Sequence, residues 1–563
     1  MGIAAAAMPD GIRLLMEEGR LWLLDARTPG PCGDCLALWR AWRGQDPPAA
    51  PQDSADCLPV AMLLAGLQAI CLARLPPLPD DDVARLRSID TATGAARDHV
   101  LMRHAACPSC AGPQPAISAD PITAAAPGPL RSRTLEQLAD TVLPIAVDGD
   151  VGIVRWVARR TDLRMAATAT ALINSPAGLL QPEHGHGRSG VRAHDPAIAA
   201  IEAIERFAGA LPGRQAPPLC ASFAELGGRA IDPALFILPN VVPDLQHGGS
   251  LKPYDPDLPM AWTPAWSMRR QASVLVPTQI AHYGAPAGDM PGGRFVVEVS
   301  NGCAAGGSLA EAMLFGLMEV IERDAFLVSW HSGRRLQAYA AAQSPDPTAR
   351  AMLARLEAEG LQVTVLDIGC GLPGSSLAVC AADPAQRLDA ALVCAAASHV
   401  DPDRALRAAL NEVLTMKRIE TDAEKGRRRA LAAQLLADPR QVRTMDDHVT
   451  QGWSSAGAQA KAFPVHAGVR PWHAFPRTAA DRLSGAALLA HYVDGVLTAA
   501  HDVLVVDQSL PPLAARGLHM VKLLAPGLLP MTFGHDNRRL DWARIARFAE
   551  HAAAMHDRPH IFP

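Results

Sequence analysis

The sequence predicts a large α/β domain preceded by a small, cysteine-bearing domain. Three observations support this fold class. Short runs rich in β-branched residues, such as 362–367, alternate with longer helical stretches such as 403–421, as in α/β folds. Two Cys-x-x-Cys pairs lie in the first part of the chain. Between the two regions, residues 114–134 are rich in proline, alanine and glycine, which is typical of a linker.

The composition is that of a globular protein with a sizeable core. Hydrophobic residues make up 49% of the 563 residues and charged residues 19%, as in soluble globular domains. The formal net charge of −5 gives no general electrostatic reason to bind nucleic acid, so we expect no nucleic-acid partner. The first residues carry no secretion signal and no apolar run is long enough to cross a bilayer, so we expect a cytoplasmic protein without membrane contact.

The N-terminal domain is predicted to span residues 1–113. Its longest apolar run, 60–73, is too short for a membrane span and is expected to form a buried helix. Eleven cysteines in a chain without a secretion signal favour thiols or metal ligands over disulfides. The two Cys-x-x-Cys pairs suit a structural zinc ion, but their wide separation leaves buried thiols as an equal alternative. The four candidate ligands are Cys32, Cys35, Cys107 and Cys110.

The second domain is predicted to follow the linker and to cover residues 135–563. Its patterning continues without a comparable break, and short β-rich runs alternate with helices throughout. The clearest predicted elements are strands at 294–300, 362–367 and 502–507 and helices at 197–207, 309–327 and 403–421.

One five-residue motif, Glu-x-x-Glu-Arg, occurs twice, each time within an apolar helical stretch. Because residues three and four apart share one face of a helix, each copy presents two carboxylates and one guanidinium together. If the two helices face each other, four carboxylates converge, and two carboxylates about 4 Å apart repel by roughly 4 kcal/mol at an effective dielectric constant of about 20. Such a cluster requires cations, and Mg²⁺ with phosphate oxygens fits best. The motif residues are Glu202, Glu205 and Arg206 in the first copy and Glu319, Glu322 and Arg323 in the second.

A purely structural explanation of the motif stays open. A single copy is most often a solvated helix face with an ion pair between positions i and i+4. The second copy follows the small residues of 300–307, which let the backbone approach a ligand at a helix N-terminus. We expect this helix to begin at Ser308, with Glu311 completing a capping box, so Glu311 has a structural and a functional explanation of equal weight.

A glycine-rich segment, 185–190, matches the dinucleotide-binding fingerprint in form only. Pro182 and His184 precede it in place of a clean strand, so we expect a loop. His184, His186 and His535 are expected to be surface or local hydrogen-bonding groups rather than ligands. The sequence contains neither a P-loop motif nor a nucleophile elbow, which disfavours a P-loop ATPase and an α/β-hydrolase.

Five segments of the second domain carry a specific resemblance to the YcaO family. The longest is 300–326, which contains the second Glu-x-x-Glu-Arg copy. The others are 148–155, 199–206, 404–418 and 521–530. This resemblance covers the chain after the linker and implies a YcaO-type domain.

In the YcaO family the paired glutamates hold Mg²⁺ and ATP, and the resemblance implies the same role here, with both arginines near phosphate. Three positions depart from the family's usual motifs: Ile198 replaces serine, Gly307 replaces asparagine and Thr415 replaces glutamine. The residues implied to bind ATP or Mg²⁺ are Glu202, Glu205, Arg206, Glu311, Glu319, Glu322, Arg323 and Glu412, with Glu202, Glu205, Glu319 and Glu322 on the Mg²⁺.

The end of the sequence favours one reaction within the family. Azoline-forming members typically end in Pro-x-Pro-x-Pro, with the terminal carboxylate in the active site, and 559–563 keeps both outer prolines around Ile561. The resemblance therefore implies ATP-dependent cyclodehydration of Cys, Ser or Thr in a ribosomally made precursor peptide to thiazoline or oxazoline, through phosphorylation of the backbone amide oxygen. Pro563, Glu322 and Arg323 are the implied catalytic residues, with the Pro563 carboxylate as proton acceptor. The alternative is that residues 559–563 are a frayed terminus without a role in the site.

The N-terminal domain resembles the late part of the ThiF-like domain often found ahead of YcaO domains. Segments 59–67 and 101–110 carry this resemblance, which favours the structural zinc. A winged-helix leader-binding module finds no room before Cys32, so we expect a truncated ThiF-like domain and a separate leader-binding partner protein. A flavin dehydrogenase and a second copy of the chain in a homodimer are further expected partners. Peptide thioamidation and a catalytically silent scaffold are the alternative functions.

Overall fold

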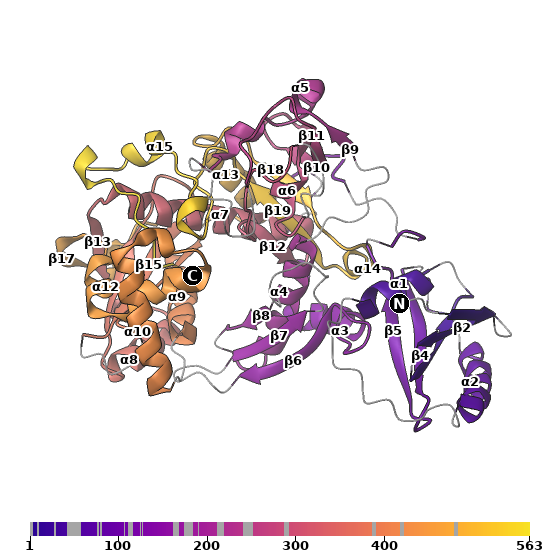
Figure 1. Ribbon diagram of the computed structural model, residues 1–563. Coiled ribbons are helices and arrows are strands. Elements are labelled where there is room, and N and C mark those ends of the chain that lie inside the picture. The colour runs from indigo at the N-terminus through magenta and orange to yellow at the C-terminus, as the bar shows by residue number, and fades with distance from the viewer. Residues whose placement is uncertain are drawn as a thin grey trace.

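The computed structural model shows a smaller domain at one end of an elongated molecule and the rest of the chain beside it (Figure 1). The described residues are 4–7, 11–17, 19–27, 30–41, 58–75, 78, 82–105, 107–110, 116–123, 125, 128–160, 168–173, 184–189, 191–210, 219–239, 251–285, 292–384, 390–416, 421–477 and 482–562. In this part of the chain, every helix is too short or too polar to cross a lipid bilayer.

The N-terminal domain is a five-stranded antiparallel sheet with a helix on each face. The strands follow chain order across the sheet. Alternating residues of one strand point to opposite faces, so Leu24 packs with Leu36 of the first helix, whereas Leu23 packs with Ala69 of the second. The elements are β1 (Ala4–Ala7), β2 (Ile12–Glu17), β3 (Arg20–Asp25), α1 (Gly33–Ala41), α2 (Leu58–Ala73), β4 (Val83–Asp90) and β5 (Ala96–Met102).

Helix α2 corrects the prediction of a fully buried helix. Ala65, Ala69 and Leu72 pack on the sheet, but Leu63 and Leu67 are 68% and 54% exposed. Apolar residues occur on every side of this helix, so its sequence carries no periodicity that would mark the exposed side.

The large domain is organised around the long helix α7 (Leu309–Ser332), which lies between two sheets. One face of α7 contacts β12 and β19 of the first sheet, and another contacts β15 and β16 of the second. The first sheet has the order β11-β10-β18-β19-β12, with β9 beside β10, and the second has the order β16-β15-β14-β13-β17. The strands are β9 (Leu219–Ala221), β10 (Met260–Ser267), β11 (Ala272–Pro277), β12 (Cys303–Gly306), β13 (Leu336–Ala340), β14 (Gln362–Asp367), β15 (Ser375–Ala382), β16 (Leu392–His399), β17 (Val465–Pro471), β18 (Leu504–Asp507) and β19 (His519–Leu524).

Shorter helices cover the outer faces of these sheets. Helices α8 and α9 pack on the second sheet with an aliphatic core that includes Leu356, Leu377 and Leu410. The helices of the large domain are α3 (Leu135–Ala146), α4 (Asp195–Ala210), α5 (Phe223–Leu226), α6 (Thr278–Ala281), α7, α8 (Pro347–Ala358), α9 (Pro402–Met416), α10 (Asp422–Ala437), α11 (Met445–Thr450), α12 (Ser455–Ala460), α13 (Gly485–Leu497), α14 (Pro511–Ala514) and α15 (Trp542–Ala546).

A small sheet of β6 (Val154–Arg160), β7 (Thr168–Ile173) and β8 (His184–Gly187) packs on α4. The expectation of a loop at 185–190 was wrong for its first part, because His184–Gly187 forms strand β8. Gly185 and Gly187 lie so close to α4 that an added Cβ would stand 2.1 Å from the Ala199 carbonyl oxygen and 1.7 Å from that of Asp195. Glycine is required there for close packing, and its low strand propensity concealed the strand.

Two other predicted elements differ from the observed ones. Residues 294–300 form no strand: the Phe295 N–H donates to the Gln279 side chain and the Arg294 carbonyl accepts from Lys252, so no ladder runs along the segment. The helix expected at 403–421 ends at Met416, and Thr421 caps the following helix.

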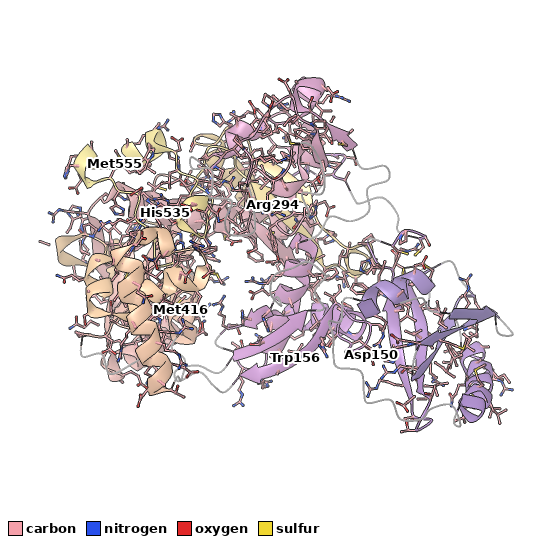
Figure 2. All side chains as sticks on the ribbon, in the orientation of Figure 1. Asp150, Trp156, Arg294, Met416, His535 and Met555 are labelled. Atoms are coloured by element: carbon pink, nitrogen blue, oxygen red, sulfur yellow. The ribbon has the colours of Figure 1, made fainter. Side chains whose placement is uncertain are left out.

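A polar network docks the N-terminal domain on the large one. Asp150 accepts from Arg20 at 2.7 Å and from Arg40 at 3.1 Å, and Trp39 stacks on Phe207 of α4 with ring centroids 5.5 Å apart. Asp150 lies at the boundary between the two domains (Figure 2). Apolar side chains of both domains form one continuous core there.

Replacing Asp150 with alanine is expected to lower the free energy of unfolding by about 3 kcal/mol, because two largely buried guanidinium groups lose their shared carboxylate. Chemical denaturation measures the change. Asp98→Ala is the matched control: its carboxylate pairs with Arg87 but is 68% exposed, so we expect less than about 1 kcal/mol. Equal losses in both variants would contradict a docking role for Asp150.

Candidate active site

The two Glu-x-x-Glu-Arg copies lie on α4 and α7, which meet at β12 in the centre of the molecule (Figure 1). The Ala305 N–H donates to Glu205 at 2.8 Å, and the Gly302 N–H donates to Glu319 at 3.3 Å. Burial together with the charges of Glu202 and Glu319 raises the pKa of Glu205 well above its ordinary value. The structure therefore brings both copies together, as the sequence predicted.

A second group of carboxylates adjoins the first. Glu322, one turn beyond Glu319, accepts from the Ser398 N–H at 3.3 Å. Burial raises the pKa of Glu322 to about 8, with the Arg323 charge opposing and the charges of Glu412 and Glu319 adding to the rise. Glu412 of α9 is ion-paired with Arg188 at 3.3 Å. Strands of the first and second sheets and the residue that directly follows β8 thus all contribute to one acidic site.

The arginines of the site only partly neutralise it. Arg206 pairs with Glu202 at 3.0 Å, and Arg323 lies 3.6 Å from Glu319 and 3.5 Å from Glu322. The buried Nη1 atom of Arg323 has no hydrogen-bond partner among the described residues. Surplus carboxylates beside an unsatisfied guanidinium fit Mg²⁺ accompanied by a polyphosphate, since the metal neutralises the former and phosphate oxygens accept from the latter.

Glu311 lies apart from this group. It accepts from Arg131 at 2.7 Å and from the Gly307 N–H at 2.8 Å, while Ser308 caps the helix by accepting from the Glu311 N–H. It stands two turns before Glu319, about 12 Å along the helix axis. Within this structure its carboxylate holds the predicted linker segment against α7; its implied role with ATP stays a prediction.

The segment that ends at Phe562 lies in the site and is not frayed. Phe562 is fully buried, with its ring 4.4 Å from the Arg323 guanidinium and 4.6 Å from the Phe326 ring. Such a desolvated cation–π contact contributes about 2 kcal/mol. Pro563 itself lies outside the described residues.

Buried polar side chains hold this segment by its backbone. Lys461 donates to the Pro559 carbonyl at 2.6 Å, and burial lowers the pKa of Lys461 to about 7. His448 donates through Nδ1 to the His560 carbonyl and accepts the Gly534 N–H at Nε2, so its ring is neutral. These contacts fix the position of Phe562 over Arg323.

The four predicted zinc ligands are also brought together. The sulfur of Cys32 lies 3.5 Å from that of Cys107, and the sulfur of Cys35 lies 3.2 Å from that of Cys110. All four thiols are free of disulfides. Four ligands at about 2.3 Å from a tetrahedral zinc have sulfurs about 3.8 Å apart, so the cluster fits a structural zinc ion.

Sequence reasoning missed Arg188 and the environment of His186. The His186 N–H donates to Glu202 at 3.1 Å, and burial lowers the pKa of the imidazole to about 4, so the ring is neutral. His186 belongs to β8 and Arg188 directly follows it, in a segment that was expected to be a loop. The only available signal was the glycine-rich segment itself.

A family model described as YcaO cyclodehydratase, ATP- and Mg²⁺-binding, matches residues 184–529, which is more than half of the chain. The chain belongs to the YcaO family. The match begins at β8 and includes every glutamate of the acidic site.

Two solved structures share the fold of this YcaO protein over nearly its whole length. A heterocyclase in complex with substrate and cofactor has a TM-score of 0.72 at 20% identity, covering 97% of this chain and 77% of that chain. The heterocyclase TruD has a TM-score of 0.60 at 19% identity, covering 95% and 73%. An uncharacterized protein of Methanothermobacter thermautotrophicus is 30% identical over 230 residues, 40% of this chain and 55% of that protein, so the match spans about half of that curated relative.

We expect the acidic site of this YcaO protein to make its response to nucleotide depend on pH. The raised pKa values of Glu205, Glu319 and Glu322 mean that these groups hold protons in the folded protein which they have released in the unfolded chain, so the contribution of these three groups to stability without ligand falls as pH rises from about 5 to about 8. Mg²⁺ held by these carboxylates would replace those protons. We therefore expect Mg²⁺ with a non-hydrolysable ATP analogue to raise Tm more at about pH 8 than at about pH 6; an equal rise at both values would contradict this.

Proposed function

We propose that this protein uses ATP and Mg²⁺ to convert Cys, Ser or Thr residues of a ribosomally made precursor peptide into thiazolines or oxazolines. One observation carries the proposal: the partly buried glutamates of α4, α7 and α9 converge at the place where Phe562 is stacked on Arg323. The site thus combines an arrangement suited to polyphosphate with the segment that resembles the C-terminal Pro-x-Pro-x-Pro segment of azoline-forming family members.

The reaction begins when the side chain of the modified residue attacks the carbonyl carbon of the preceding peptide bond. The resulting oxyanion takes the γ-phosphoryl group of ATP, and the oxygen then leaves as phosphate, so that peptide and ATP become azoline peptide, ADP and phosphate. Arg323, with its unsatisfied Nη1 atom, stabilises the developing negative charge on the phosphoryl group. The Pro563 carboxylate accepts the proton released by the attacking group.

The remaining residues of the site hold the nucleotide in place. Glu202, Glu205, Glu319 and Glu322 hold Mg²⁺, which neutralises charge on the phosphates when bound. Arg206, Glu311 and Glu412 complete the proposed nucleotide contacts. Cys32, Cys35, Cys107 and Cys110 hold a structural zinc that maintains the N-terminal domain. We further propose a separate leader-binding protein, a flavin dehydrogenase that oxidises the product, and a homodimer.

Mass spectrometry of the peptide encoded beside this gene, co-expressed with this chain and its neighbours, tests the proposal. Loss of one water per modified residue is expected, and no loss with Glu322→Gln. Exchange of oxygen for sulfur would instead establish thioamidation, and an unchanged peptide would support a silent scaffold.

A further inference from the structure

Cys380 and Cys394 face each other across two neighbouring strands. They are direct partners in the antiparallel register of β15 and β16, and their sulfur atoms lie 3.5 Å apart without a bond. Directly opposed residues of an antiparallel pair have Cβ atoms about 4.5 to 5.5 Å apart, and a disulfide needs about 3.5 to 4.5 Å. A disulfide therefore forms there with only a small approach of the two strands.

The pair lies on the face of the second sheet that looks toward α7. Residues of β15 and β16 alternate between two cores: Val379 and Val393 pack with α8 and α9, whereas Cys394 packs in the cluster that contains Phe326 of α7, with Cys380 at its margin. Four residues beyond Cys394, on the same face, the Ser398 N–H donates to Glu322. The two thiols thus adjoin the acidic site.

We propose that Cys380 and Cys394 are a reversible disulfide site on the wall of the active site. Cys380 is partly exposed and Cys394 is 1% exposed, so a small disulfide such as oxidised glutathione reaches the pair from the Cys380 side. The Cys380 thiolate displaces one glutathione thiol and forms a mixed disulfide. Cys394 then attacks the Cys380 sulfur, releases the second glutathione thiol and closes the intrachain bond, with two protons lost and two electrons passed to the oxidant.

The test treats the full-length protein with oxidised glutathione, alkylates the remaining thiols, digests with trypsin and analyses the peptides by mass spectrometry. We expect a linked pair of peptides, 356–387 and 388–404, lighter by two hydrogen atoms than the reduced pair and separated again by a reductant. The first peptide also contains Cys370, which is buried and donates to Asp324. Cys370→Ser is therefore the matched control and must keep the link, whereas Cys380→Ser must lose it.

Two results would overturn the proposal. One is full alkylation of Cys380 and Cys394 in wild-type protein after treatment with oxidised glutathione. Glutathione attached to the exposed Cys71 and Cys220 in the same sample shows that the oxidant was active. The other is a link that disappears in Cys370→Ser. The first result needs no variant, so the test stands even where a substitution impairs folding.

Discussion

Glu322→Gln is expected to lower ATP turnover by about 100-fold or more. The substitution keeps the size of the side chain and its contact with the Ser398 N–H, but it removes one of the charges that we propose hold Mg²⁺ against the phosphates. Loss of a single electrostatic contact to a transferring group costs about 10²- to 10³-fold in rate. Release of phosphate from ATP in the presence of precursor peptide measures the effect.

Glu357→Gln is the matched control for this prediction. Glu357 lies on the exposed side of α8, so its substitution should leave ATP turnover unchanged. Full ATP turnover by the Glu322→Gln variant, with its secondary structure intact, would show that Glu322 does not act on ATP and would contradict the proposed site.

Cys35→Ser is expected to release zinc and to unfold the N-terminal domain. Its sulfur is buried within the four-cysteine cluster and lies 3.2 Å from the sulfur of Cys110. Structural zinc sites contribute about 10 to 16 kcal/mol of binding free energy in small peptides, which is as large as the usual stability of a whole protein, about 5 to 15 kcal/mol. The measured zinc content should fall from one ion per chain to none. Limited proteolysis should then remove the residues before α3.

Cys71→Ser controls for the loss of any thiol from the same domain. Cys71 is exposed on α2 and distant in sequence from both pairs, so this variant should keep its zinc and its resistance to protease. A wild-type protein purified without zinc, yet equally stable, would contradict the proposed role of the cluster.

The motif helices were the most predictable part of this protein. Glu-x-x-Glu-Arg places its charged groups on one face of an otherwise apolar helix, and the buried surroundings of Glu205 and Glu322 follow from that pattern. The start of α7 was equally predictable, because Ser308 caps the helix as its sequence indicates. Strand β14 was located to the residue, since three consecutive β-branched residues occupy its centre.

Other parts depend on tertiary contacts that leave little trace in the sequence. Strand β8 contains two glycines because α4 presses against it, so the position of Arg188 beside Glu412 was not evident. Segment 294–300 has the composition of a strand, but its backbone bonds go to a side chain and a loop. Which side of α2 is exposed depends on how much of the helix the sheet covers, and local composition does not predict that coverage.

The most direct test of the proposed chemistry follows one oxygen atom. A precursor peptide labelled with ¹⁸O at the backbone carbonyl before a modified cysteine is incubated with the protein, its partners, ATP and Mg²⁺, and the released phosphate is analysed by mass spectrometry. Amide phosphorylation predicts one ¹⁸O atom in the phosphate for each azoline formed. Azoline formation with the label recovered in water instead of phosphate would contradict it.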